Sequence, residues 1–168
     1  MRDVCNMRTT HRWLAPLALL PLLAAAPPPG TPVVLAPQPG TALDRTARGL
    51  VAQDLAESVR ARERPLVLVG MARLGAAADR PALFVQLQSP RQCGSAGCST
   101  SVFAWTGGRY QKVLDGVAGH MAVAASRHAG MADLQAGTET YAWNGKAYAD
   151  TVPAPAIDLR PRTRRRAR

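Results

Sequence analysis

The sequence predicts a mainly β protein, a twisted antiparallel sheet of two strand-plus-hairpin units with one N-terminal helix. The segments Phe103–Tyr110 and Tyr141–Tyr148 share one pattern: aromatic, Ala, Trp, polar, Gly, two residues, Tyr. The second segment begins 38 residues after the first. From residue 66 onward, apolar residues form short runs or alternate with polar ones, which is typical of strands. Only residues 41–62 place apolar residues at helical spacing.

The first 26 residues have the pattern of an export signal. Arg2, Arg8 and Arg12 form a positive start, and an apolar run of about 14 residues follows from Trp13. That run is too short to span a bilayer comfortably, and it ends in three alanines that suit a signal peptidase. We therefore expect a cleaved signal peptide and a periplasmic or secreted protein; an uncleaved amphipathic anchor is the alternative.

Residues 27–40 contain six prolines, which predict an extended, partly polyproline linker. The formal net charge of +10 lies mostly outside the predicted domain. Residues 160–168 contribute +6 and residues 1–26 contribute +2, which leaves only +2 for residues 27–159. The basic pI is therefore no sign of a nucleic-acid-binding domain, and we expect no specific nucleic acid partner.

We expect a single globular domain over residues 41–150, with a helix over 41–62 followed by a β-rich region over 66–150. Thr41 can cap the helix, with Asp44 in the capping-box position, and Pro65 stops it. The apolar face of the helix consists of Leu43, Ala47, Leu50, Val51, Leu55 and Val59.

The predicted strands follow from runs of apolar and β-branched residues between turn residues. Asn144-Gly145 is the strongest turn signal among them, because both residues accept the backbone of a two-residue hairpin turn. We expect strands at 66–69, 82–88, 99–105, 109–114, 121–125, 131–135, 138–143 and 146–150.

Each hairpin follows a further strand, so each unit is a strand plus a hairpin with an aromatic-x-Trp-x-Gly-x-x-Tyr tip. Over roughly residues 71–150 this arrangement resembles a group of uncharacterised exported bacterial proteins. It is similar in turn to single blades of the integrin-type (FG-GAP or VCBS) propeller repeat. In that repeat, an Asp-rich calcium loop precedes the first strand. Here only Asp79 could be an oxygen ligand, whereas calcium needs six or more oxygens, so no calcium site is expected.

Cys93 and Cys98 are the two cysteines that remain once the predicted signal, with Cys5, is removed. In an oxidising compartment such a pair is expected to form a disulfide. A redox-active dithiol is the alternative, but it usually has Cys-x-x-Cys spacing at a helix N-terminus, and strand residues follow Cys98.

No pattern indicates a metal, a cofactor or a catalytic group. A zinc site from Cys93, Cys98, His120 and His128 would have poor ligand spacing. A hydrolase triad from Ser95, one of the two histidines, and Asp115 or Asp133 lacks a nucleophile motif. Carboxylates are scattered, and no phosphate-binding glycine loop is present.

Residues 151–168 predict a disordered basic tail that could bind an anionic surface such as lipid or lipopolysaccharide. A frayed terminus without function is the alternative. The residues that would make this contact are Arg162, Arg164, Arg165, Arg166 and Arg168.

The sequence does not determine an activity. Our first hypothesis is a non-enzymatic envelope protein that binds an envelope protein or polymer through its hairpin tips and its disulfide loop. The second is a small periplasmic hydrolase or thiol-redox enzyme. The binding residues expected under the first hypothesis are Trp105, Tyr110, Trp143 and Tyr148.

Overall fold

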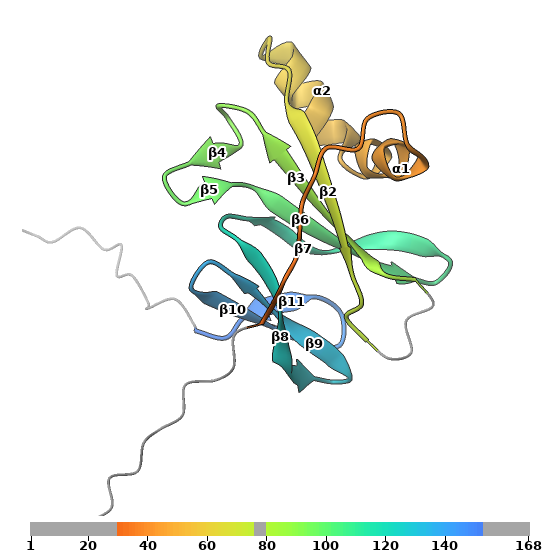
Figure 1. Cartoon of the computed structure of the whole chain (residues 1–168), viewed down its shortest axis with the longest axis vertical. Helices are drawn as coiled ribbons and strands as arrows, with labels where there is room; N and C mark the ends of the chain where they lie inside the picture. The colour runs from red at the N-terminus through yellow and green to blue at the C-terminus, as the bar shows by residue number, and fades with distance from the viewer. Residues whose placement is uncertain (1–29, 76–79, 153–168) are drawn as a thin grey trace, which may run out of the picture.

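Two antiparallel sheets stack on one another, and two helices cover the outer face of the first sheet (Figure 1). The structure is a computed structural model that describes residues 30–75 and 80–152. Its elements are β1 (Thr31–Pro32), α1 (Ala42–Leu50), α2 (Ala52–Arg60), β2 (Leu66–Ala72), β3 (Ala82–Gln88), β4 (Cys93–Gly94), β5 (Gly97–Cys98), β6 (Thr100–Thr106), β7 (Arg109–Val117), β8 (Met121–His128), β9 (Met131–Ala136), β10 (Glu139–Trp143) and β11 (Tyr148–Asp150).

The mainly β class and the antiparallel pairing are confirmed, but the strands form two main sheets rather than one. The first sheet has the order β2-β3-β6-β7, and the second has the order β1-β8-β9-β10-β11. Each repeat unit and the strand before it thus form a separate four-stranded meander, β2-β3-β6-β7 in the first sheet and β8-β9-β10-β11 in the second. Each meander has an apolar face that must be shielded from water, and stacking the two sheets on one another buries apolar surface of both.

The two meanders have the same register. Phe103 pairs with Leu83 in the first sheet, and Tyr141 pairs with Leu134 in the second. Within the hairpins, each Trp lies directly opposite its Tyr, as the repeated pattern predicts. The chain between the paired residues is thirteen residues longer in the first unit than in the second, because the first unit also contains the small β4–β5 hairpin.

The tyrosine hydroxyl of each hairpin bonds a backbone carbonyl in this register, closely in the second unit and weakly in the first. Tyr148 is buried and donates to the carbonyl oxygen of Ala132 at 2.7 Å. Tyr110 donates to the carbonyl oxygen of Pro81 at 3.4 Å. Pro81 and Ala132 each lie two residues before the paired Leu of their unit, so both tyrosines bond the equivalent carbonyl.

Equivalent faces of the two sheets point in the same direction, so the sheets do not pack on one another through equivalent faces. Leu83 faces the helices and packs against Ala47 and Val51, whereas its counterpart Leu134 faces the first sheet and packs against Phe84. The helices thus cover the outer face of the first sheet, and the first sheet covers the equivalent face of the second. Without α1 and α2, the apolar face of β3 and β6 would be exposed to water.

The predicted helix 41–62 is two helices with a bend at Val51. Thr41 caps α1 as predicted, because its hydroxyl accepts from the Asp44 N–H at 3.0 Å. At Val51, which is buried between the helices, φ is −111° and ψ is 24°. The bend turns α2, so the predicted apolar face does not continue to its end: Val59 is 67 % exposed and Ser58 is buried instead.

Residues 30–36 are extended, as predicted for the proline-rich segment 27–40, and they pack along the edges of both sheets. We call this segment the strap. Thr31 and Pro32 pair with β8, and Ala36 forms a bridge with Val69 of β2. Figure 1 shows the strap crossing from the second sheet to the first. Its Val33 and Leu35 side chains close the core at this edge.

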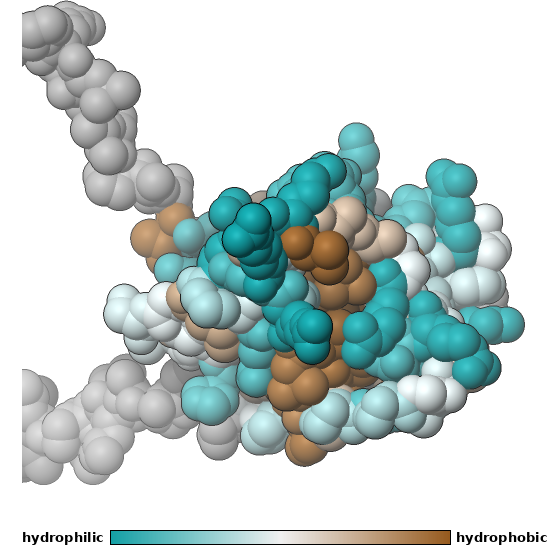
Figure 2. Space-filling model, turned by 90° about the horizontal axis from the view of Figure 1, so that it is seen from above, coloured by the Kyte–Doolittle hydropathy of each residue, from teal (hydrophilic) through white to brown (hydrophobic). Residues whose placement is uncertain are grey.

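The surface around the helices is largely polar. Seen from above, a strip of apolar residues lies between polar side chains, and smaller apolar areas lie apart from it (Figure 2). Among the residues that the structure describes, no helix is long and apolar enough to cross a membrane.

Replacing Tyr148 with Phe removes a buried hydroxyl and leaves the Ala132 carbonyl without its partner. We expect this change to lower the free energy of unfolding by about 1–2 kcal/mol. Tyr110→Phe is the matched control, because its hydrogen bond is long and partly exposed, and it should cost less than about 0.5 kcal/mol. Chemical denaturation measures both values. Equal losses would contradict the role assigned to Tyr148.

Candidate functional site

The two tryptophan-bearing hairpins end on the same side of the molecule and line one pocket. Trp105 and Trp143 are both half-buried there, each in contact with the tyrosine across its own hairpin. The ring centroids are 5.0 Å apart for Trp105–Tyr110 and 5.2 Å apart for Trp143–Tyr148, with tilted or edge-on rings. Such contacts add to the stability of the hairpins as well as shaping the pocket.

We call this site the two-tryptophan pocket. Its volume is about 300 Å³, and most of its lining is apolar. Leu74, Ala82, Ala104 and Met131 form much of the wall, and Arg80 lies at the rim. The pocket opens at the end of the stack where β3 and β9 begin, between the two sheets.

One basic side chain, that of Arg80, lines this pocket, and others lie on neighbouring segments. The Arg80 guanidinium lies over the Trp105 ring, 4.2 Å from its centroid, which is a cation–π contact. Arg127 donates to the carbonyl oxygen of Leu74, a residue of the pocket wall, at 3.4 Å. The hairpin turns add Arg109 and Lys146, and residues 103–110 and 141–148 contain no Asp or Glu.

The nearby carboxylate of Asp133 does not offset this charge at the surface, because it is buried. Its side chain is 3 % exposed, and its oxygens lie 2.7 and 2.9 Å from Nδ1 of His128. His128 itself is 57 % exposed. Its ring is therefore fixed by a buried acid and presents its other nitrogen, Nε2, toward solvent.

Tyr148 lies in the core rather than in the pocket wall. Burial, together with the nearby charge of Asp133, raises the pKa of its phenol well above the usual range. Tyr141, in the neighbouring strand β10, has a pKa raised to about 12 by burial and by a hydrogen bond to Glu139. Tyr148 and Tyr110 thus act on the fold, and Trp105 and Trp143 are the two predicted binding residues that line a pocket.

The disulfide between Cys93 and Cys98 is present, as the sequence predicts. The two cysteines lie opposite one another in the β4–β5 hairpin, with Gly94 paired to Gly97 beyond them. This hairpin precedes β6, and Trp105 lies near the end of the same strand. Seven residues of strand span about 20 Å, so the disulfide loop and the tryptophans lie at opposite ends of β6.

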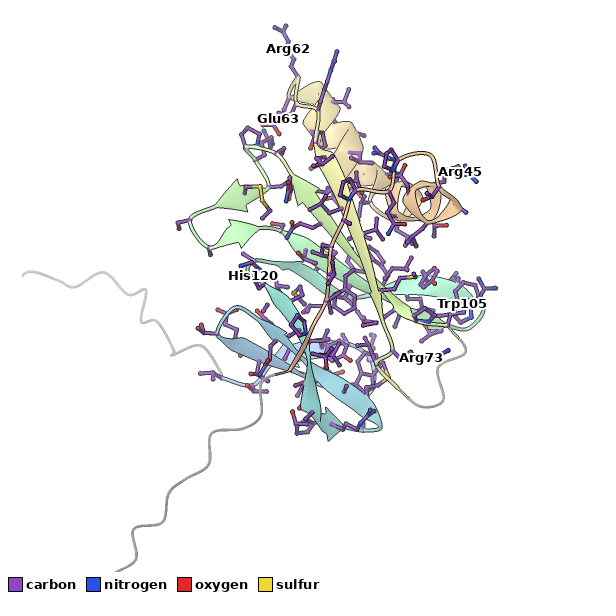
Figure 3. All side chains as sticks on the ribbon, viewed as in Figure 1. Arg45, Arg62, Glu63, Arg73, Trp105 and His120 are labelled. Atoms are coloured by element: carbon purple, nitrogen blue, oxygen red, sulfur yellow. A yellow bond between two sulfur atoms is a disulfide. The ribbon has the colours of Figure 1, made fainter. Side chains whose placement is uncertain are left out.

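Figure 3 shows this separation, with Trp105 on one side of the molecule and His120 on the other, the side of the disulfide. The residues weighed for a hydrolase triad are likewise divided. Asp133 binds His128 at the two-tryptophan end, and Asp115 binds Ser101 and Lys112. These two partners hold the pKa of Asp115 below its usual value, against the opposing effect of burial. Across residues 30–75 and 80–152, no hydrogen-bonded set joins a hydroxyl, a histidine and an acid.

The same part of the chain contains no group of three or more His, Cys, Asp or Glu that could hold a metal ion. Cys93 and Cys98 are bonded to each other, so neither offers a thiolate in this structure. The predicted signal segment and the tail arginines at 162–168 lie outside the residues that the structure describes.

Sequence reasoning missed Arg80 as a member of the site. Arg80 stands in a predicted turn, and nothing in that turn marks it as a neighbour of Trp105. The signal was the strand register: β3 starts directly after Pro81 and pairs with the strand of Trp105, with Leu83 opposite Phe103. Pairing the two predicted strands in antiparallel order would have placed Arg80 beside the indole.

Comparison with protein-family models, with curated protein sequences and with solved structures finds no match to this chain. The similarity to propeller blades therefore stays a prediction, and the site is interpreted from its own geometry.

Replacing both Cys93 and Cys98 with Ser opens a loop of six residues. We expect this change to lower the free energy of unfolding by about 2 kcal/mol, because the denatured chain gains loop entropy. Denaturation of the oxidised protein, the reduced protein and the double variant measures the effect. The double variant and the reduced wild type should agree, and unchanged stability in both would contradict a structural disulfide.

Proposed function

We propose that this protein is an exported, non-enzymatic envelope protein that binds an acidic segment of another protein in the two-tryptophan pocket. The observation that carries the proposal is the convergence of Trp105, Trp143 and Arg80 on one apolar pocket. Trp and Arg are the residues that contribute most to binding energy at protein interfaces, particularly where they shape a central pocket.

The size of the pocket supports a protein partner over a polymer of sugars. A volume of about 300 Å³ is at the small end of ligand pockets and has room for one bulky apolar side chain. Trp105 and Trp143 are half-buried at its wall, so they do not offer the broad exposed aromatic platform on which a sugar ring stacks. An apolar side chain of the partner would fill the pocket and displace water from it.

The charge around the pocket supports an acidic partner. Arg80, Arg109, Arg127 and Lys146 are exposed near or beside it, and the carboxylate of Asp133 is buried against His128. Carboxylates that flank the partner's apolar side chain would meet these cations. Such complementarity raises the rate of association and excludes basic partners.

Export is proposed from the first 26 residues, whose positive start, apolar run and small residues match a signal peptide. The disulfide is in keeping with an oxidising compartment. A tail that holds the protein to an anionic surface through its arginines belongs to the same proposal.

The export part predicts a processed protein. Expressed from its full sequence in a Gram-negative host, the chain should be recovered from the periplasm. Its new N-terminus, read by mass spectrometry, should fall at or shortly before Pro27. An intact N-terminus in the cytoplasmic fraction would contradict export. Replacing Leu19 and Leu20 with Arg interrupts the apolar run and should abolish processing.

The binding part predicts that a charge reversal at the pocket rim removes the partner. Arg80→Glu should reduce capture of acidic proteins from an envelope extract by at least tenfold, because it reverses the rim charge and removes the stacking on Trp105. Arg91→Glu is the control of equal charge, since Arg91 is exposed next to the disulfide hairpin. Quantitative mass spectrometry of the captured proteins at low and high salt measures the difference.

Trp105→Ala tests the apolar half of the same site and should weaken capture at both salt concentrations. Each variant is first checked for unchanged thermal unfolding. Capture that is equal for wild type, Arg80→Glu and Trp105→Ala would contradict the proposed function.

A further inference from the structure

A second cleft lies at the opposite end of the stack, beside the disulfide hairpin. Its volume is about 490 Å³. The strap forms one wall, the inner face of β2 and β3 a second, and the disulfide hairpin and the turn before β8 the others. We call it the glutamine cleft, after Gln86 and Gln88 in its lining.

Strand β3 changes character where it enters this cleft. On the face that looks toward the second sheet, Ala82 and Phe84 are buried in the core. The next two residues on that face are Gln86 and Gln88, which are half-buried and line the cleft. An apolar pair would extend the core here. Two amides in its place leave a polar surface within an otherwise apolar layer.

The two amides are held in place by a chain of hydrogen bonds. Gln86 Nε2 donates to Oγ1 of the fully buried Thr100 at 3.0 Å, and Gln88 Nε2 donates to Gln86 Oε1 at 3.0 Å. The carbonyl oxygen of the Gln88 amide has no protein partner among the residues that the structure describes. It is therefore an oriented acceptor that faces an open space.

The opposite wall adds a second polar group. His120 lines the cleft, and its ring makes no hydrogen bond to any residue of the described ranges. Between the two polar walls lie aliphatic side chains: Val33 and Leu35 from the strap, Leu68 from β2, and Met121 from β8.

The walls of the cleft are rigid. The disulfide closes the β4–β5 hairpin, and Gly97 of that hairpin packs on the backbone of Gly119. Gly119 packs in turn on Gly137: a Cβ at Gly119 would lie 2.8 Å from the Gly137 nitrogen. A preformed cleft of this kind binds a ligand without the entropy cost of ordering its walls.

Among the residues that the structure describes, the lining contains no acidic side chain, no Lys or Arg, and no aromatic residue other than His120. A charged ligand would lose its hydration without gaining a partner ion, and a sugar would find no broad ring on which to stack. A carboxamide fits, because its N–H groups can donate to Gln88 Oε1 while its apolar body covers the aliphatic wall. We infer that the glutamine cleft is a second binding site, for a small uncharged amide with an aliphatic side chain.

The test uses N-acetyl-L-leucinamide as the probe and follows the amide signals of the ¹⁵N-labelled protein by NMR. We expect the amide to shift the signals of residues 96–98 and 119–121 and of the Gln88 side chain. N-acetyl-L-leucine has the same shape and carries a carboxylate, so it should bind at least tenfold more weakly. Glucose tests the sugar alternative and should cause no shift in these residues.

Gln88→Leu removes the oriented acceptor and should weaken binding of the amide probe about tenfold, which is the value of one hydrogen bond of about 1.4 kcal/mol. Gln111→Leu is the control, because Gln111 is an exposed glutamine near the other end of the fold. The dispersion of the NMR spectrum verifies that each variant is folded.

Arg80→Glu, at the two-tryptophan pocket, should leave binding of the probe unchanged, so the result does not depend on the proposed partner site. The inference is overturned if no localised shift occurs at saturating probe or if the acid binds as well as the amide. It is also overturned if glucose competes or if Gln88→Leu binds like the wild type.

Discussion

The equal register of the two meanders is the constraint on which the rest of the structure depends. A tyrosine hydroxyl in each hairpin reaches the same backbone carbonyl of its unit, at Pro81 and at Ala132. This bond is possible only when each Trp–Tyr pair and each strand before it are aligned in one way. Because both units are aligned alike, both tryptophans reach the same end of the stack and share one pocket.

Stacking in the same sense creates a second requirement, which the helices meet. The second sheet packs on the first through one of its faces. The equivalent face of the first sheet carries Leu83 and Phe103 and points away from the second sheet. That face has no third sheet to cover it. The Ala47 and Val51 side chains of the bent helix pair bury it instead, while the strap closes the edge where β2 and β8 run. Two units, a helix layer and a strap therefore complete two hydrophobic clusters, one on each face of the first sheet.

The two ends of the stack differ in chemistry because the units differ in their loops. The hairpin turns at one end are alike. They carry basic residues and border an apolar pocket. At the other end the first unit has an extra segment with the disulfide, whereas the second unit turns directly from β9 to β10. The longer loop overhangs the sheets and forms the wall of the glutamine cleft. A macromolecule at one end and a small neutral molecule at the other would therefore not compete.

The sequence by itself determined the class of the fold, the approximate positions of the eight longer strands β2, β3 and β6–β11, the two tryptophan hairpins and the disulfide, but not β1, β4 or β5. These depend on neighbours in the chain: alternating apolar residues, Asn144-Gly145, and two cysteines in a short glycine-rich loop. Only the tertiary structure decided that the sheet is two sheets, that Val51 bends the helix, and which side chains share a site. Arg80 meets Trp105, and Gln88 faces His120 across a cleft, through contacts between distant segments. Local patterns cannot specify such contacts, because they follow from how apolar faces stack to exclude water.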